Sequence, residues 1–157
     1  MTTTTQERRA LVTMSVGLGL TVLVTILPFL DGATHLLADH VRAGYPSYDA
    51  AQVGAAVTTY QYLLAGVGVL GAAAWLWTIR AVRRGRRWAR AATAAAFTLA
   101  LLVALTALLV RDTSGDVGLA PVVGWAGLLP CVAGGLAVVL LWRAPRPGAV
   151  SPGTPAA

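Results

Sequence analysis

The sequence RAVRRGRRWAR, at residues 80–90, lies between two long apolar segments and decides the fold. It contains six of the twelve arginines of the chain. Short arginine-rich loops are typical of the cytoplasmic side of a membrane, where they join two transmembrane helices. The stretch therefore predicts that one membrane-spanning helix ends just before it and that another begins just after it.

The composition of the whole chain is that of a membrane protein. Its 157 residues are 57% hydrophobic and only 11% charged, and the mean hydropathy is +0.70. Soluble domains are about a quarter charged. A helix crosses a hydrocarbon core of about 30 Å with about 20 residues. Four apolar segments are long enough, at residues 10–30, 53–79, 91–110 and 120–142.

The sequence predicts an all-α membrane protein with four transmembrane helices in a compact bundle, forming one domain over residues 1–146. Residues 147–157 are rich in Pro, Gly and Ala and are expected to form a disordered tail. Between the first two spans, residues 33–43 (ATHLLADHVRA) place Leu36, Leu37 and Val41 on one side of a helix. This pattern predicts a short extracytoplasmic helix.

The distribution of charge orients the four spans. Both termini and the 80–90 loop lie on one side, which carries a net charge of +9, against −3 on the other. Arginine-rich segments stay in the cytoplasm, so both termini are expected there. Arginine is the only basic residue besides two histidines, and asparagine is absent, a bias that indicates a GC-rich bacterial genome. We therefore expect a multi-pass protein of the bacterial inner (plasma) membrane that binds no nucleic acid.

Small residues recur every four positions along the predicted spans, which places them on one face of each helix. Such faces permit the close approach on which helix association in lipid depends. The clearest are Thr13, Gly17, Thr21 and Thr25 in the first span, and Gly54, Thr58 and Gly66 in the second. We expect these faces to turn inward in a compact bundle, and the alternative is that they form a homo-oligomer interface.

The ends of the spans carry their own signals. Tryptophans commonly anchor helices at the membrane interface, and four lie near the predicted cytoplasmic boundary: Trp75, Trp77, Trp88 and Trp142. Ser47 precedes the second span and is expected to cap its first turn.

The first candidate site is Asp31, His35 and Asp39, which would share one face of a loop helix at positions i, i+4 and i+8. Carboxylate and imidazole groups at this spacing suit a transition metal such as zinc. His35 could instead act as a pH-sensitive latch between the two carboxylates. The third interpretation is a solvated polar face without a ligand.

The second candidate site is the most polar cluster within a span, formed by Thr58, Tyr60, Gln61 and Tyr62. These side chains could line a small ligand cavity, or they could make hydrogen bonds between helices.

The third candidate site is a set of arginines that would share one face if the second helix continued into the 80–90 loop. Near a membrane surface, each arginine contributes about 1 kcal/mol to the binding of anionic lipid. The set is Arg80, Arg83, Arg84 and Arg87.

Several functions are disfavoured by what the spans contain. No Asp, Glu, Lys, Arg or His lies in the middle of a span, which argues against a proton-coupled transporter and against bis-histidine haem. The single Cys131 excludes an intramolecular disulfide and a CxxC pair. Residues 66–71 match GxGxxG, but they lie within an apolar helix without a preceding strand. We therefore expect no catalytic residue and no cofactor.

Residues 65–92 (AGVGVLGAAAWLWTIRAVRRGRRWARAA) and 122–142 (VVGWAGLLPCVAGGLAVVLLW) resemble uncharacterised actinobacterial four-helix integral membrane proteins. That family carries no assigned activity, so the resemblance implies a fold and a membrane location only. We expect a non-enzymatic protein that is accessory or regulatory through helix–helix and lipid contacts, with a homo-oligomer or another membrane protein as partner. The alternatives are a small oligomeric transporter or channel with a polar path near residues 58–62, and a membrane enzyme that uses His35 and Asp39.

Overall fold

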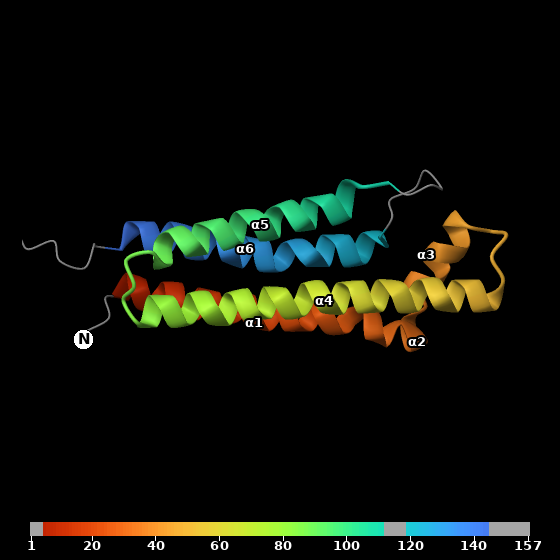
Figure 1. Cartoon of the computed structure of the whole chain (residues 1–157), viewed down its shortest axis with the longest axis horizontal. Coiled ribbons are helices and arrows are strands. Elements are labelled where there is room, and N and C mark those ends of the chain that lie inside the picture. The colour runs from red at the N-terminus through yellow and green to blue at the C-terminus, as the bar shows by residue number, and fades with distance from the viewer. Residues whose placement is uncertain (1–4, 112–118, 145–157) are drawn as a thin grey trace, which may run out of the picture.

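The structure, a computed structural model, describes residues 5–111 and 119–144 (Figure 1). The tail expected at residues 147–157 lies outside these described residues. Helices follow one another along the chain: α1 (Thr5–Ile26), η1 (Leu27–Leu30), α2 (Asp31–Thr34), α3 (Leu36–Gly44), α4 (Ala50–Arg83), α5 (Ala89–Leu109) and α6 (Pro121–Arg143).

Four helical segments are long and apolar enough to cross a membrane, which confirms the predicted fold class. They are α1 with η1, α4, α5 and α6. With 34 residues, α4 is the longest of the helices. At 1.5 Å per residue it measures about 51 Å. Because the hydrocarbon core is about 30 Å thick, α4 is longer than a perpendicular crossing needs.

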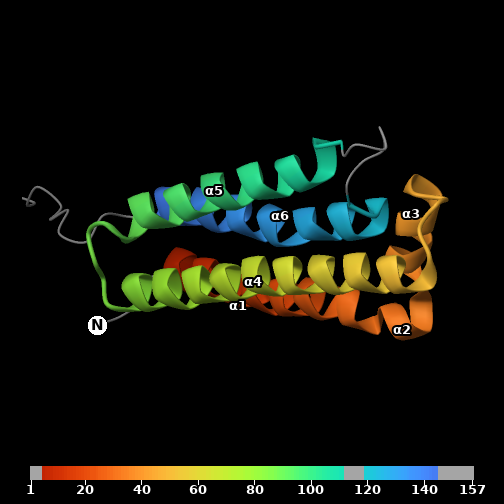
Figure 2. The ribbon, with the colours of Figure 1, turned by 45° about the vertical axis from the view of Figure 1, so that its right-hand side comes forward.

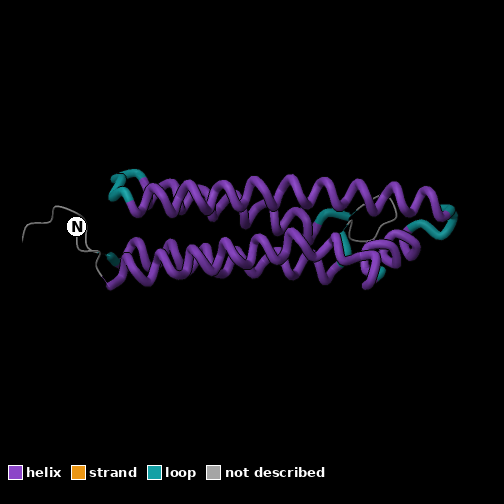
Figure 3. Tube along the Cα trace, turned by 90° about the horizontal axis from the view of Figure 1, so that it is seen from below, coloured by secondary structure: helices purple, strands orange, loops and turns teal. Residues whose placement is uncertain are grey.

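The four long helices lie side by side along the long axis of the molecule (Figures 1 and 2). Helix α1 packs against α4 and α6, and α6 also packs against α5. We call one end of the bundle the arginine end, where α1 begins, residues 84–88 join α4 to α5, and α6 finishes. The opposite end, the cap end, holds α2 and α3, as the view from below also shows (Figure 3).

Two clusters of buried side chains hold the two ends of the bundle together. The cluster at the arginine end joins α1, α4 and α6 through Ala10, Met14, Ile79, Ala137 and Leu141. The cluster at the cap end joins α3 to the start of α6 through Leu37, Leu119, Ala120 and Val123. The apolar side of α3 therefore faces the bundle, as its sequence predicts.

Trp75 connects α4 to α1 in the middle of the bundle. Its Nε1 donates a hydrogen bond of 3.0 Å to Thr21 Oγ1. A Cβ atom at Gly17 would overlap the indole ring, so only a residue without a side chain lets the ring lie there. Trp75 therefore packs between two helices, and its role as an interfacial anchor stays a prediction. By contrast, Trp77, Trp88 and Trp142 are exposed on the bundle surface.

The small-residue faces of the first two spans have opposite outcomes. In α1, Gly17 and Thr21 face α4, as predicted. In α4, the predicted face of Gly54, Thr58 and Gly66 lies exposed on the outside of the bundle. The residues of α4 that meet α1 are instead Gly68, beside Thr25, and Gly71, beside Thr21. Both faces of α4 carry small residues, so their spacing did not distinguish them.

Local hydrogen bonds define where α4 begins and ends. Its cap is Asp49 and not the predicted Ser47, because Asp49 Oδ1 accepts from Gln52 N at 2.8 Å and Gln52 Oε1 accepts from Asp49 N at 2.9 Å. This reciprocal pair is a capping box. At the other end, Gly85 has a φ of 62° and Arg86 N donates to Ala81 O at 3.1 Å, a glycine-dependent helix stop.

Candidate functional site

The cap end does not contain the continuous helix that was predicted for residues 33–43. The chain breaks at His35, which has a left-handed φ of 53° and separates α2 from α3. The carbonyl of His35 still accepts from Asp39 N at 2.8 Å, so α3 starts directly after the break. The break changes the direction of the chain, and the i, i+4, i+8 spacing of Asp31, His35 and Asp39 no longer defines one helix face.

The described residues do not bring the proposed metal ligands around His35 together. Asp39 pairs with Arg42 at 3.2 Å on an exposed surface, where such pairs contribute little to stability. The structure does not describe the side chain of Asp31. Over the residues that are described, no group of three or more His, Cys, Asp or Glu side chains could hold a metal ion. Metal binding here stays a prediction.

The polar cluster of α4 is divided between two sides of the helix. Gln61 Nε2 donates to the carbonyl oxygen of Pro28, in η1, at 3.0 Å. Tyr60 is half-buried and packs on the cap-end cluster around Leu37. Thr58 is exposed and donates to Gly54 O at 2.9 Å, and Tyr62 is 74% exposed. The structure thus separates Tyr60 and Gln61 from Thr58 and Tyr62, and a ligand cavity shared by all four stays a prediction.

The predicted arginine face is interrupted because α4 ends at Arg83. Arg80 and Arg83 lie on the last turn of the helix, whereas Arg84 and Arg87 lie in the loop beyond it. The expectation that all four share one face of a continued helix is therefore wrong, and its physical reason is the left-handed Gly85. The binding of anionic lipid by these arginines is a separate question and stays a prediction.

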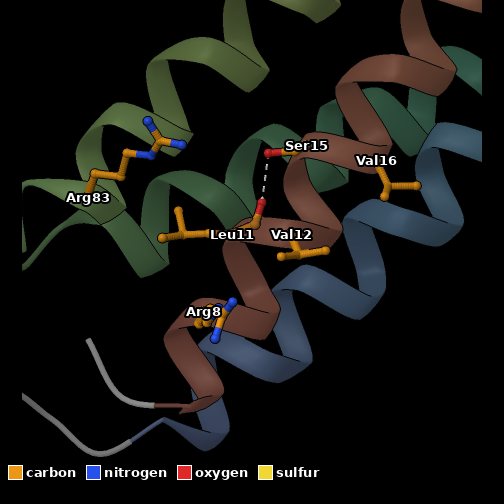
Figure 4. Close-up of a pocket in the computed structure, with 6 residues that line it drawn as sticks. All are labelled: Arg8, Leu11, Val12, Ser15, Val16 and Arg83. Atoms are coloured by element: carbon orange, nitrogen blue, oxygen red, sulfur yellow. Dashed lines mark hydrogen bonds between the residues drawn. The ribbon is translucent and has the colours of Figure 1, made fainter. Parts of the chain in front are cut away.

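A groove at the arginine end brings together residues that are far apart in the sequence. It has a volume of about 490 Å³ and lies between α1 and the end of α4. Its lining residues are Arg8, Leu11, Val12, Ser15, Val16 and Arg83. In the view of Figure 4, Leu11 lies between the two arginine side chains. Of these six residues, only Arg83 was singled out from the sequence.

A second arginine that the sequence did not single out has a structural role. Arg90, in the first turn of α5, is half-buried and its NH2 group donates to Ala144 O at 2.8 Å. This bond ties the start of α5 to the end of α6. The described arginines at this end therefore divide into exposed ones and one that holds two helices together.

The chain shows no match to protein-family models, to curated protein sequences or to solved structures.

Proposed function

We propose that the chain is a small non-enzymatic membrane protein with an accessory or regulatory role, acting through lipid contacts and through contact with another membrane helix. We further propose that it resides in the bacterial plasma membrane with both termini in the cytoplasm. The charge asymmetry of the loops supports this orientation. The observation that carries the proposed role is the outer face of α4, which the described residues leave uncovered.

The outer face of α4 alternates small and large residues at helical spacing, all exposed: Thr59, Tyr62, Gly66, Leu70, Ala73 and Trp77. Tyr62 and Leu70 are 74% and 73% exposed. Around Gly66, the described residues leave the space beyond a Cβ atom open to at least 4 Å.

Exposed apolar side chains alone do not indicate a partner, because lipid is as apolar as leucine. Small residues that alternate with large ones along one helix face are a more specific sign of a contact with another helix. Gly66 and Ala73 would let the backbone of a second helix approach closely, while the large side chains on either side would pack around it. This combination favours a helix as the occupant of the outer face.

Photocrosslinking tests the proposal directly. A benzoylphenylalanine introduced at Leu70 and irradiated in intact membranes is expected to give a protein adduct of discrete mass. The substitution Gly66→Leu is expected to lower the adduct yield at least fivefold, because its side chain fills the space that a close helix needs. A mass of twice the chain identifies a second copy, and any other mass identifies a different membrane protein.

The matched control is Gly19→Leu on α1, because Gly19 is also exposed and has open space beyond its Cβ position. It is expected to leave the adduct yield unchanged. The proposal is wrong if the probe at Leu70 captures only lipid, or if both glycine variants lower the yield equally.

A further inference from the structure

We infer that the groove between α1 and α4 at the arginine end binds one anionic phospholipid, with the phosphate held between Arg8 and Arg83. This inference rests on the proposed function only in that the chain works within a bilayer. It concerns a different surface from the outer face of α4, and it names a ligand that the loop arginines alone do not specify.

The lining of the groove combines the two kinds of surface that a lipid contacts, one basic and one apolar. Arg8 lies in the second turn of α1, and Val16 lies eight residues further along the same helix. At 1.5 Å per residue this separation is about 12 Å. Leu11, Val12 and Val16 form the apolar part of the lining, and the guanidinium groups of Arg8 and Arg83 lie on either side of Leu11 (Figure 4).

The two arginines are available to an anion. Both side chains are exposed, and over the residues that the structure describes neither guanidinium has a hydrogen-bond or ion-pair partner. They come from different helices, so an anion between them is reached from two sides. Planar guanidinium groups suit phosphate oxygens because they present paired N–H donors.

The deeper part of the groove suits a hydrocarbon chain. Ser15, the one polar residue there, donates its hydroxyl hydrogen to Leu11 O at 3.0 Å. Val12 and Val16 are 58% and 54% exposed. Because α1 crosses the membrane, these side chains lie at the depth of the acyl chains. The occupant must therefore be both anionic and apolar, which describes an anionic phospholipid and not free phosphate.

Native mass spectrometry of the purified chain, titrated with phosphatidylglycerol in detergent micelles, tests the site. The double variant Arg8→Gln/Arg83→Gln is expected to raise the dissociation constant of the first bound lipid about thirtyfold, since each arginine contributes about 1 kcal/mol near a membrane surface. The matched control is Arg84→Gln/Arg86→Gln. It removes the same charge from the same end, at two exposed residues that do not line the groove, and is expected to change the constant less than threefold.

A second variant tests the apolar half of the site. Val16→Trp fills the groove from an exposed position, and it is expected to weaken phosphatidylglycerol binding at least fivefold while leaving both arginines in place. Glycerol phosphate, which lacks acyl chains, is expected not to compete at concentrations equal to the lipid.

Three results would overturn the inference. The control double variant could weaken binding as much as the groove variant, which would indicate general surface charge. Phosphatidylcholine could bind as tightly as phosphatidylglycerol, which would show that the site does not select a negative headgroup. Glycerol phosphate could displace the lipid, which would indicate a site for a soluble anion. None of these results bears on crosslinking from Leu70, so failure of the lipid site and failure of the proposed helix contact are distinguishable.

Discussion

At the scale of single residues, Gln61 has a structural role that its position in the sequence does not reveal. Pro28 interrupts the hydrogen bonding at the end of α1, and η1 follows. The carbonyl oxygen of Pro28 then accepts a hydrogen bond from Gln61 Nε2, 33 residues further along the chain. Within a bilayer no water replaces such a donor. The amide of Gln61 therefore stabilises the junction between α1 and the cap end.

The substitution Gln61→Leu is expected to destabilise the bundle by about 1 kcal/mol, because hydrogen bonds between membrane helices contribute about 0.6 kcal/mol on average and at most about 1.7 kcal/mol. The measurement is the SDS midpoint of reversible unfolding in mixed micelles. Tyr62→Phe is the control, since Tyr62 is largely exposed, and it is expected to leave the midpoint unchanged.

The same variant separates the structural role of Gln61 from the transport alternative. Vesicles that contain the wild-type chain are expected to release entrapped potassium and radiolabelled sucrose no faster than protein-free vesicles. A wild-type efflux that Gln61→Leu abolishes without shifting the unfolding midpoint would instead support a polar path near residues 58–62.

At the scale of helices, the sequence predicts the number of spans well, but it predicts poorly which side of each helix contacts its neighbours. Each apolar segment has at least the length that a bilayer demands, so four spans follow from length and composition alone. Facing is harder, because a membrane helix is apolar on all sides and lacks the polar face that orients a helix in water. Gly66 and Gly68 both look like packing residues, yet Gly68 meets Thr25 of α1 and Gly66 meets nothing in the described bundle.

Sequence patterns also do not predict local changes in backbone conformation. Residues 33–43 have a continuous amphipathic pattern, but a left-handed His35 divides them, since α3 must turn to bury Leu37 and Val41. The groove lined by Arg8 and Arg83 depends on which faces of α1 and α4 meet. Arg83 lies 75 residues after Arg8 in the chain, and no short-range spacing connects them.

The contact of α1 with α4 is expected to depend on Gly17. In Gly17→Leu the new side chain would occupy the position of the Trp75 ring, and overpacking of this kind typically costs about 1–3 kcal/mol. The Nε1–Thr21 hydrogen bond would be lost with the ring's position. The expected result is a lower SDS midpoint of unfolding, together with a red-shifted tryptophan emission as Trp75 leaves its half-buried site.

Gly19→Leu is the appropriate comparison for Gly17→Leu. It adds the same side chain to the same helix two residues away, where no atom of the described residues lies near the Cβ position. It is expected to leave both the midpoint and the emission unchanged. Equal destabilisation by the two variants would mean that helix propensity, and not the contact with Trp75, is responsible.

At the scale of the whole molecule, the two ends of the bundle differ in charge and in construction. Among the described residues, the arginine end holds nine of the twelve arginines of the chain, whereas Arg42 and Arg111 lie at the cap end. The arginines thus act at three levels. Arg90 ties α5 to α6, Arg8 and Arg83 line the groove, and the set as a whole supplies the bias that we propose orients the bundle.

Orientation is expected to weaken when that bias is removed. Replacing the six arginines of residues 80–90 by glutamine leaves four arginines at one end against two at the other. Because loop arginines set topology and the remaining bias is small, a minor fraction of the molecules is then expected to insert inverted. The readout is labelling of Ser47→Cys, in a Cys131→Ala background, by a membrane-impermeant maleimide in intact cells.

Arg42→Gln/Arg111→Gln is the opposite control, because it removes the only arginines of the cap end and so strengthens the bias. Labelling at position 47 is expected to stay complete in this control and to become incomplete in the loop variant. Arg90→Gln alone separates orientation from packing, since it breaks the bond to Ala144 O and changes the arginine count by one. Full labelling of the six-arginine variant would contradict the proposed orientation mechanism, and it would leave lipid and partner binding as the reason for so basic an end.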